Sequence, residues 1–206
     1  MGNKPAKPKG KYLGKLLKKF PNMNFEELFN IYEDFQTQSR GTGRLSKSDF
    51  IKVYRRAFKG NSGAKTLAEN IFQSFDTDNS GYVDFEEFLV GLSLTEASLG
   101  GSDRETKFKK LKWAFNVYDK DRSGTIDKQE MRSIVRAVSE LAPDDSFLGN
   151  CSADDFADRL FNQVDANGDG DITFEEFRRA AEINETLIDL LLPAPASILD
   201  QQTIYC

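Results

Sequence analysis

Residues 76–87 read Asp-Thr-Asp-Asn-Ser-Gly-Tyr-Val-Asp-Phe-Glu-Glu. Oxygen donors stand at positions 1, 3, 5, 7 and 12 of this stretch, and they are Asp76, Asp78, Ser80, the backbone carbonyl of Tyr82, and Glu87. Gly81 at position 6 permits a sharp turn, because glycine has no Cβ to oppose a positive φ. Asp84 at position 9 can hold a coordinating water. A Ca²⁺ ion takes about six to eight oxygens, so this spacing predicts a calcium-binding loop between two helices.

The same spacing occurs twice more, in residues 119–130 and 165–176. The donors of the first copy are Asp119, Asp121, Ser123, Thr125 and Glu130, and those of the second are Asp165, Asn167, Asp169, Asp171 and Glu176. Position 6 is glycine and position 8 is apolar in all three stretches. Three copies, each between apolar residues at helical spacing, argue against the alternative of acidic surface turns. The pattern predicts three Ca²⁺ sites of the EF-hand type, with Mg²⁺ as a candidate occupant at rest.

Residues 38–49 form a degraded fourth copy when Leu45 is aligned with the apolar position 8. The turn glycine is kept, but Gln38 and Arg40 replace the acids of positions 1 and 3. Arg40 places a positive charge where a dication needs an oxygen. We therefore expect this stretch to keep the loop fold, to bind no calcium and to pair with the next copy. In chain order the four stretches, 38–49, 76–87, 119–130 and 165–176, are named loops 1 to 4.

Apolar side chains recur at helical spacing between the loops, which predicts an all-α protein of four EF-hands in two paired lobes. Asn24, followed three residues later by Glu27, is expected to cap the helix that enters loop 1. Paired loops should form short antiparallel β-bridges at position 8, Leu45 with Val83 and Ile126 with Ile172. A Leu-rich run after loop 4 predicts an extra C-terminal helix. The expected parts are a basic N-terminal segment (1–22), an N-lobe (23–95), a linker (96–106), a C-lobe (107–182), and a C-terminal helix and tail (183–206).

Histidine is absent from the 206 residues, which excludes Ser-His-Asp and Cys-His catalysis and ordinary histidine zinc sites. The carboxylates are accounted for as ligands or solvated surface, so we expect a protein that is not an enzyme. The two cysteines, Cys151 and Cys206, imply no disulfide framework, which fits a reducing compartment. No stretch approaches the length of a membrane span and no secretory signal is visible, so a cytoplasmic location is expected. We expect no nucleic-acid partner.

The N-terminal segment differs from the rest of the chain in charge. Residues 1–20 hold seven lysines and no acid, whereas the other residues carry 21 basic and 33 acidic side chains. Gly2 is an acceptor for N-myristoylation, with Ala6 where a Ser or Thr is usual. An acyl chain and nearby lysines together would hold the protein peripherally on the anionic, cytoplasmic face of membranes. The alternative is an unmodified, solvated basic tail.

Three intact loops after a degraded first loop, with Met-Gly-Asn at the start, resemble the neuronal calcium sensor family. Residues 105–118 resemble that family's helix before the third loop, and residues 153–177 resemble its guanylate-cyclase-activating branch. Arg40 and Gly41 stand where the family usually has Cys-Pro. The resemblance implies myristoylation and an aromatic N-lobe groove that takes an amphipathic helix of a membrane-associated target, such as a guanylate cyclase, kinase or channel. The groove is expected to include Phe35, Ile51, Tyr54, Phe58, Phe85 and Leu89, and dimerisation stays open.

Other classes of calcium-binding protein make competing predictions. A buffer binds calcium without opening, but the basic head, the extra helix and the 17 phenylalanines argue against one. A permanent regulatory subunit, as calcineurin B is to its phosphatase, also begins with an acylatable glycine, but its first loop is intact. A calcium-triggered photoprotein relies on histidines that this chain lacks. Apolar-dye binding with and without calcium separates a sensor from a buffer.

Overall fold

The computed structural model describes residues 10–57, 62–95, 104–141, 148 and 151–183. The extra C-terminal helix expected after loop 4, the acyl acceptor Gly2 and the groove candidate Phe58 lie outside these residues. Within them the chain is mostly helical, with two short antiparallel strand pairs, which confirms the predicted fold class. None of the described helices combines the length and the apolar character that a membrane span requires.

The first half of the chain forms two helix–loop–helix units. Its elements are α1 (Gly10–Lys19), α2 (Phe25–Gln38), β1 (Arg44–Ser46), α3 (Lys47–Ala57), α4 (Ser62–Phe75), β2 (Tyr82–Asp84) and α5 (Phe85–Thr95). Asn24 caps α2 as predicted: its side chain accepts from the Glu27 amide at 2.9 Å, and the Glu27 carboxylate accepts from the Asn24 amide at 3.0 Å. β1 pairs with β2 in the predicted register, Leu45 opposite Val83.

The second half repeats the arrangement. Its elements are α6 (Arg104–Tyr118), β3 (Thr125–Ile126), α7 (Lys128–Leu141), α8 (Ala153–Val164), β4 (Ile172–Thr173) and α9 (Phe174–Ile183). Helix α6 begins at Arg104, so the range expected for the linker, 96–106, includes the first residues of a helix. β3 pairs with β4, and Ile126 lies opposite Ile172, again as predicted. On the outside of this lobe, both oxygens of Asp158 on α8 accept hydrogen bonds of 2.6 Å from Arg132 on α7.

The core follows the helical apolar spacing. In the N-lobe, phenylalanine rings from α2, α3, α4 and α5 meet edge-on or tilted, with Phe35, Phe50, Phe72, Phe75 and Phe85 all buried. In the C-lobe, Phe115 and Phe177 pack together at 5.7 Å between ring centroids. Aromatic pairs of this kind add to the gain from burying apolar area. Each lobe therefore closes around its own pair of loops.

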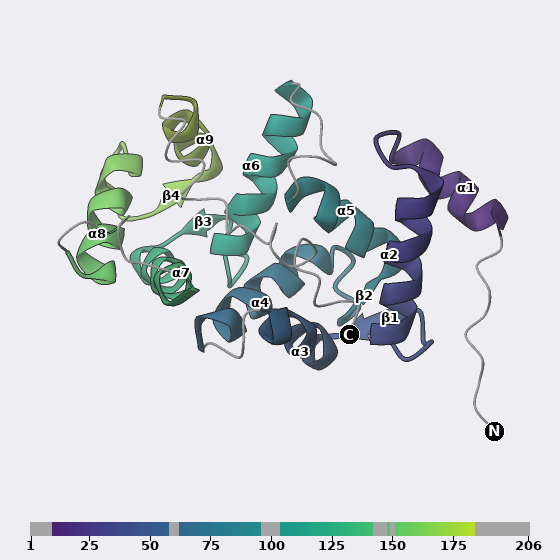
Figure 1. Cartoon of the computed structure of the whole chain (residues 1–206). Helices are drawn as coiled ribbons and strands as arrows, with labels where there is room; N and C mark the ends of the chain where they lie inside the picture. The colour runs from purple at the N-terminus through teal and green to yellow at the C-terminus, as the bar shows by residue number, and fades with distance from the viewer. Residues whose placement is uncertain (1–9, 58–61, 96–103, 142–147, 149–150, 184–206) are drawn as a thin grey trace.

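The two lobes pack closely against each other. Figure 1 shows α8 and α9 at one end of the molecule and α1 and α2 at the other, with α4, α5 and α6 between them. Helix α4 of the N-lobe lies along α7 and also contacts α6. A Cβ added at Gly63 on α4 would lie 2.4 Å from the carbonyl oxygen of Ala137 on α7. Glycine is thus required where α4 and α7 approach, and loops 2 and 3 are brought near each other.

Candidate metal centre

Loops 2 and 3 each gather three carboxylates. In loop 2 an oxygen from each of Asp76, Asp78 and Glu87 lies within 4.8 Å of the others. In loop 3 the same holds for the residues at the same positions, Asp119, Asp121 and Glu130. Clusters of oxygen donors from positions 1, 3 and 12 suit a hard dication such as Ca²⁺.

Backbone amides hold the position-1 aspartate of each of these two loops in place. The two oxygens of Asp76 accept from the amides of Ser80 at 2.9 Å and Gly81 at 3.0 Å. Gly81 has φ +80°, which lets its amide point back toward the loop's first residue. Asp119 is held identically by Ser123 at 2.9 Å and Gly124 at 3.0 Å. Both aspartates are 6% exposed, so their carboxylates are fixed in place before any ion arrives.

The glutamate at position 12 connects the two ends of each loop. Glu87 accepts from the Thr77 amide at 3.0 Å and from the Asp84 amide at 3.1 Å. Glu130 accepts from the amides of Lys120 at 2.8 Å and Asp127 at 3.1 Å. Glu87 lies in the first turn of α5 and Glu130 in the first turn of α7. Each of these carboxylates therefore joins its loop to the helix that leaves it.

Loop 4 has the same backbone plan with a different donor set. Asp165 accepts from the amides of Gly168 at 2.8 Å and Gly170 at 3.1 Å. Asn167 at position 3 offers a neutral amide oxygen, and within the described residues loop 4 forms no third cluster of three carboxylates. The side chain of Asp171 accepts from the Thr125 hydroxyl at 3.3 Å, which links it to loop 3. The remaining predicted donors, Ser80, Tyr82, Ser123, Thr125, Asp169 and Glu176, lie in their loops as the numbering requires.

The position-12 glutamates differ in electrostatic environment. Burial raises the pKa of the Glu130 carboxyl above its ordinary value. In loop 4 the backbone hydrogen bond from Thr173 lowers the pKa of Glu176 instead. In loop 2 the hydrogen bonds from Ser80 lower the pKa of Asp78.

Loop 1 is closed by its own side chains. Its position-12 residue, Asp49, accepts from the Ser46 hydroxyl at 2.8 Å and lies 3.3 Å from the ammonium of Lys52. The guanidinium of Arg40 lies 3.7 Å from the same carboxylate. The positive charges next to Asp49 are thus supplied by side chains of the protein. Loop 1 nevertheless keeps its turn and its strand pairing with loop 2.

Loops 2 and 3 are joined across the lobe interface by hydrogen bonds that sequence reasoning missed. The Arg122 guanidinium of loop 3 donates to the carbonyls of Gln73 at 2.7 Å and Asp76 at 3.3 Å, at the end of α4. In return the side-chain amide of Gln73 donates to the Lys120 carbonyl at 2.7 Å, and the side-chain amide of Asn70 donates to the Val117 carbonyl at 2.9 Å. The last carbonyls of a helix lack partners within it, so each lobe caps the incoming helix of the other.

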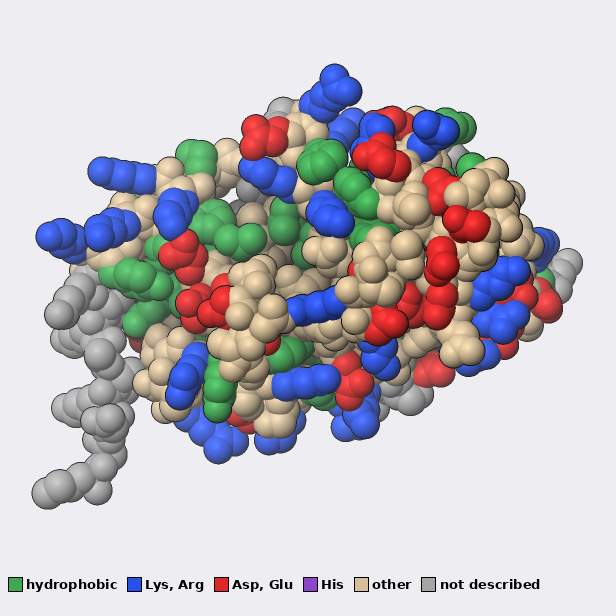
Figure 2. Space-filling model, turned by 180° about the vertical axis from the view of Figure 1, so that it is seen from behind, with side chains coloured by type: hydrophobic (Ala, Val, Ile, Leu, Met, Phe, Trp, Pro, Cys, Tyr) green, Lys and Arg blue, Asp and Glu red, His purple; other side chains and the backbone are tan. Residues whose placement is uncertain are grey.

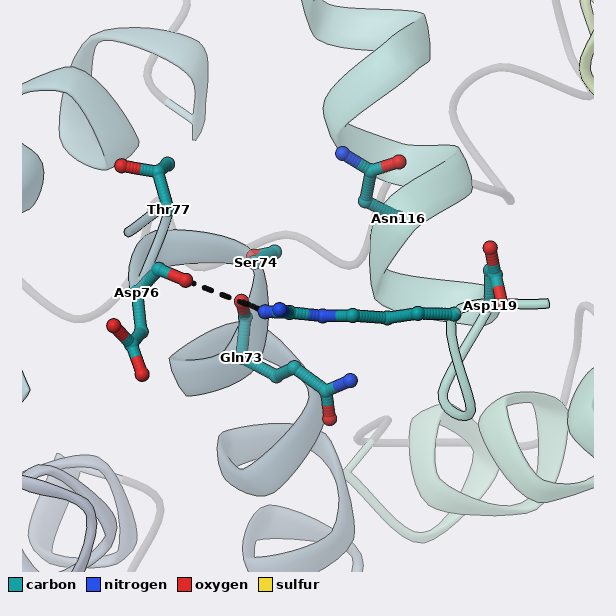
Figure 3. A pocket seen from close by; sticks show the side chains of 7 residues that line it. Gln73, Ser74, Asp76, Thr77, Asn116 and Asp119 are labelled. Atoms are coloured by element: carbon teal, nitrogen blue, oxygen red, sulfur yellow. Dashed lines mark hydrogen bonds between the residues drawn. The ribbon is translucent and has the colours of Figure 1, made fainter. Parts of the chain in front are cut away.

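A polar cavity of about 390 Å³ lies at this junction, between the last turn of α4 and the end of α6 (Figure 3). Its lining comes from both lobes: Gln73, Ser74, Asp76, Thr77, Asn116, Asp119 and Arg122. It includes the position-1 aspartates of loops 2 and 3. The only sequence signal for this arrangement is Arg122, a long cation at position 4 of a calcium loop.

The predicted groove residues lie in the N-lobe interior. Phe35, Tyr54, Phe85 and Leu89 are all buried, and Ile51 is half-buried. The ring of Phe85 packs against Phe35 at 5.2 Å between centroids. A groove at this place would require α5, which carries Phe85 and Leu89, to move away from α2.

Comparison with known proteins gives consistent matches. The EF-hand domain pair family matches residues 36–92 and 108–182. Guanylyl cyclase-activating protein 1 of Gallus gallus is 31% identical over 166 residues, which cover 80% of this chain and 77% of that protein. Calcineurin B of Candida glabrata is 33% identical over 83% of this chain and 89% of its own length. Recoverin of Homo sapiens is 28% identical over 98% of both.

Proposed function

Because the chain belongs to the EF-hand family, with homologues among the neuronal calcium sensors, we propose that this calcium-binding protein is a sensor that switches a partner protein. Loops 2, 3 and 4 each hold one Ca²⁺ and loop 1 holds none. The observation that carries the proposal is the position of Glu87 and Glu130. Each belongs to a preformed cluster of oxygens and also to the first turn of the next helix.

The residues present fit the ion. Loop 2 supplies Asp76, Asp78, Ser80, the Tyr82 carbonyl and Glu87; loop 3 supplies Asp119, Asp121, Ser123, the Thr125 carbonyl and Glu130; loop 4 supplies Asp165, Asn167, Asp169, the Asp171 carbonyl and Glu176. In this family such loops bind calcium at about 10⁻⁷ to 10⁻⁵ M in sensors. Mg²⁺ competes for the same oxygens at rest.

Calcium binding would open the N-lobe through α5. Glu87 lies two residues after Phe85 and two before Leu89, and both of these are packed in the lobe interior. An ion bound by Glu87 competes with the hydrogen bonds that this carboxylate accepts from the Thr77 and Asp84 amides. The resulting shift of Glu87 would turn α5 and expose an aromatic surface for an amphipathic helix of the target. The name of guanylyl cyclase-activating protein 1 supports a cyclase as one candidate target.

The N-terminal segment would hold the sensor at a membrane. Helix α1 buries Leu13 and Leu16 against the N-lobe and exposes its lysines. The ring of Tyr12 lies 6.5 Å from that of Phe85, so α1 contacts the helix that Phe85 begins. An acyl chain on Gly2 gives marginal binding alone, and lysines near an anionic leaflet supply the second signal.

The test separates a sensor from a buffer. Native mass spectrometry should find three calcium ions, and Glu87→Gln, Glu130→Gln and Glu176→Gln should each lose one. Apolar-dye fluorescence should rise with calcium in the unaltered protein and not in Glu87→Gln. Three bound ions without any rise in dye fluorescence would show a buffer and end the sensor proposal.

A permanent regulatory subunit is the second candidate function, and the 33% identity to calcineurin B favours it. Such a subunit stays bound to its enzyme with and without calcium. Affinity capture from a lysate in calcium and again in chelator distinguishes the two. A partner retained in chelator supports the regulatory-subunit function, and a partner released by chelator supports the sensor.

A further inference from the structure

A basic surface replaces the lost calcium site of loop 1. Residues 40–56 contain six cations and one carboxylate, that of Asp49. All six cations are exposed. They define the α3 basic face, which consists of Arg40, Arg44, Lys47, Lys52, Arg55 and Arg56.

The local fold presents these cations on one surface. Phe50 and Tyr54 of α3 are buried in the lobe, whereas Lys52, Arg55 and Arg56 lie at spacings of three and four residues on the outer side. Figure 2, which views the molecule from behind, shows several Lys and Arg side chains along its lower edge, while Asp and Glu are densest toward the right. Arg44 extends the face onto β1, with its guanidinium 4.2 Å from the centre of the Tyr82 ring.

Charge is also distributed unevenly along the whole chain, with the basic excess in its first part. Residues 1–60 carry 14 basic and 5 acidic side chains, whereas residues 61–206 carry 14 basic and 28 acidic ones. The α3 basic face therefore belongs to the basic part of a chain whose charge is unevenly distributed along the sequence. Such a charge distribution orients a protein toward a negative surface before contact.

The composition of the face indicates what it binds. Protein interfaces centre on buried apolar or aromatic anchors, but residues 40–56 include no exposed large apolar side chain. Only Tyr82, on the neighbouring strand, lies partly exposed beside Arg44. An anionic lipid leaflet needs no anchor, because each Lys or Arg near it adds its own attraction.

We propose that the α3 basic face binds the anionic surface of a membrane, as a contact separate from the N-terminal lysines. Helix α2 runs from Phe25 to Gln38 between α1 and loop 1, a length of about 20 Å. Two cationic contacts at opposite ends of α2 fix the orientation of the N-lobe on the leaflet. The acidic C-lobe then faces solvent. This inference does not depend on calcium sensing by loops 2 to 4.

The experiment uses the full, unacylated chain and phosphatidylcholine vesicles with and without phosphatidylserine. The test variant is Lys52→Gln/Arg55→Gln/Arg56→Gln, and a second triple, Arg40→Gln/Arg44→Gln/Lys47→Gln, covers the other half of the face. The control changes net charge equally at exposed positions elsewhere: Arg104→Gln/Lys107→Gln/Lys109→Gln. Circular dichroism checks that all are folded.

Each test variant should bind phosphatidylserine vesicles about ten- to a hundredfold more weakly than the unaltered protein, since it lacks three of the six cations that attract an anionic leaflet. The difference should shrink at high salt. The control should lose much less. Equal losses in test and control variants would show that net charge alone matters and would overturn the proposal. Unchanged vesicle binding in both test triples would also overturn it. If only changes to the N-terminal lysines weakened vesicle binding, the proposed role of the α3 basic face would be wrong, and membrane association through the N-terminal segment would remain.

Discussion

Replacing Gly63 by alanine tests the close packing of the two lobes. The added Cβ would lie 2.4 Å from the Ala137 carbonyl oxygen and 2.9 Å from the Cβ of Glu140, both on α7. Non-bonded carbon atoms are comfortable at about 3.5–4.0 Å, so α4 and α7 must separate by about 1 Å. The obstacle is helix backbone, which cannot swing aside as a long side chain can.

Two opposing effects set the magnitude. Overpacking a tight contact costs about 1–3 kcal/mol. Alanine in place of a helical glycine returns about 0.5–1 kcal/mol by reducing the entropy of the unfolded chain. The net loss should be about 1 kcal/mol, which lowers the melting temperature of a chain of this size by about 2–4 °C.

Thermal unfolding followed by circular dichroism measures the effect, with Gly14→Ala as the matched control. Gly14 lies in α1, and a Cβ added there would meet nothing within 4 Å. The control should therefore melt at the same temperature or slightly higher. If Gly63→Ala were stabilised as the control is, α4 and α7 would not touch in solution, and the lobe interface described above would be wrong.

Three further predictions concern the loops and the C-lobe. Arg122→Gln removes two hydrogen bonds to the end of α4 and should lower the melting temperature by about 2–4 °C; no change would mean that the bonds do not persist in solution. Glu176→Gln should abolish calcium binding in loop 4 and, through the β3–β4 pairing, weaken it in loop 3; calorimetry that finds loop 3 unaffected contradicts this coupling. Arg132 lowers the pKa of Asp158 below its ordinary value of 3.8, so the pair stabilises the fold above that pH and loses its effect as the pH falls through the lowered pKa. The melting temperature of Arg132→Gln should accordingly fall less than that of the unaltered protein below pH 4, and parallel pH profiles would rule the pair out.

The local features of the fold could be predicted from the sequence because their determinants are close together in the chain. The Asn24 cap depends on a residue three positions away, and the opposition of Leu45 and Val83 follows from one repeated motif. The clustering of the carboxylates at positions 1, 3 and 12 of loops 2 and 3 follows from the same motif. In each case the spacing alone limits the geometry to one solution.

The lobe interface could not be predicted in this way. Asn70 and Gln73 each bond to a residue 47 positions away, and that pairing depends on how two separately closed lobes dock. Neither hydrophobic periodicity nor a calcium motif encodes the docking. The state of the expected groove could not be predicted from the sequence either. Its aromatic residues show the same apolar spacing whether they line an open surface or, as here, a closed core.

The reciprocal capping of α4 and α6 limits how freely this protein can be divided or recombined. Either lobe prepared alone would begin its second or third loop from a helix whose last carbonyls have lost their donors. A chimaera that takes one lobe from a relative would meet the same difficulty unless residues 70, 73 and 122 were exchanged together. The two halves resemble repeats of one module, yet their shared helix caps make them depend on each other. Substitutions at these three positions should therefore be tolerated together more readily than one at a time.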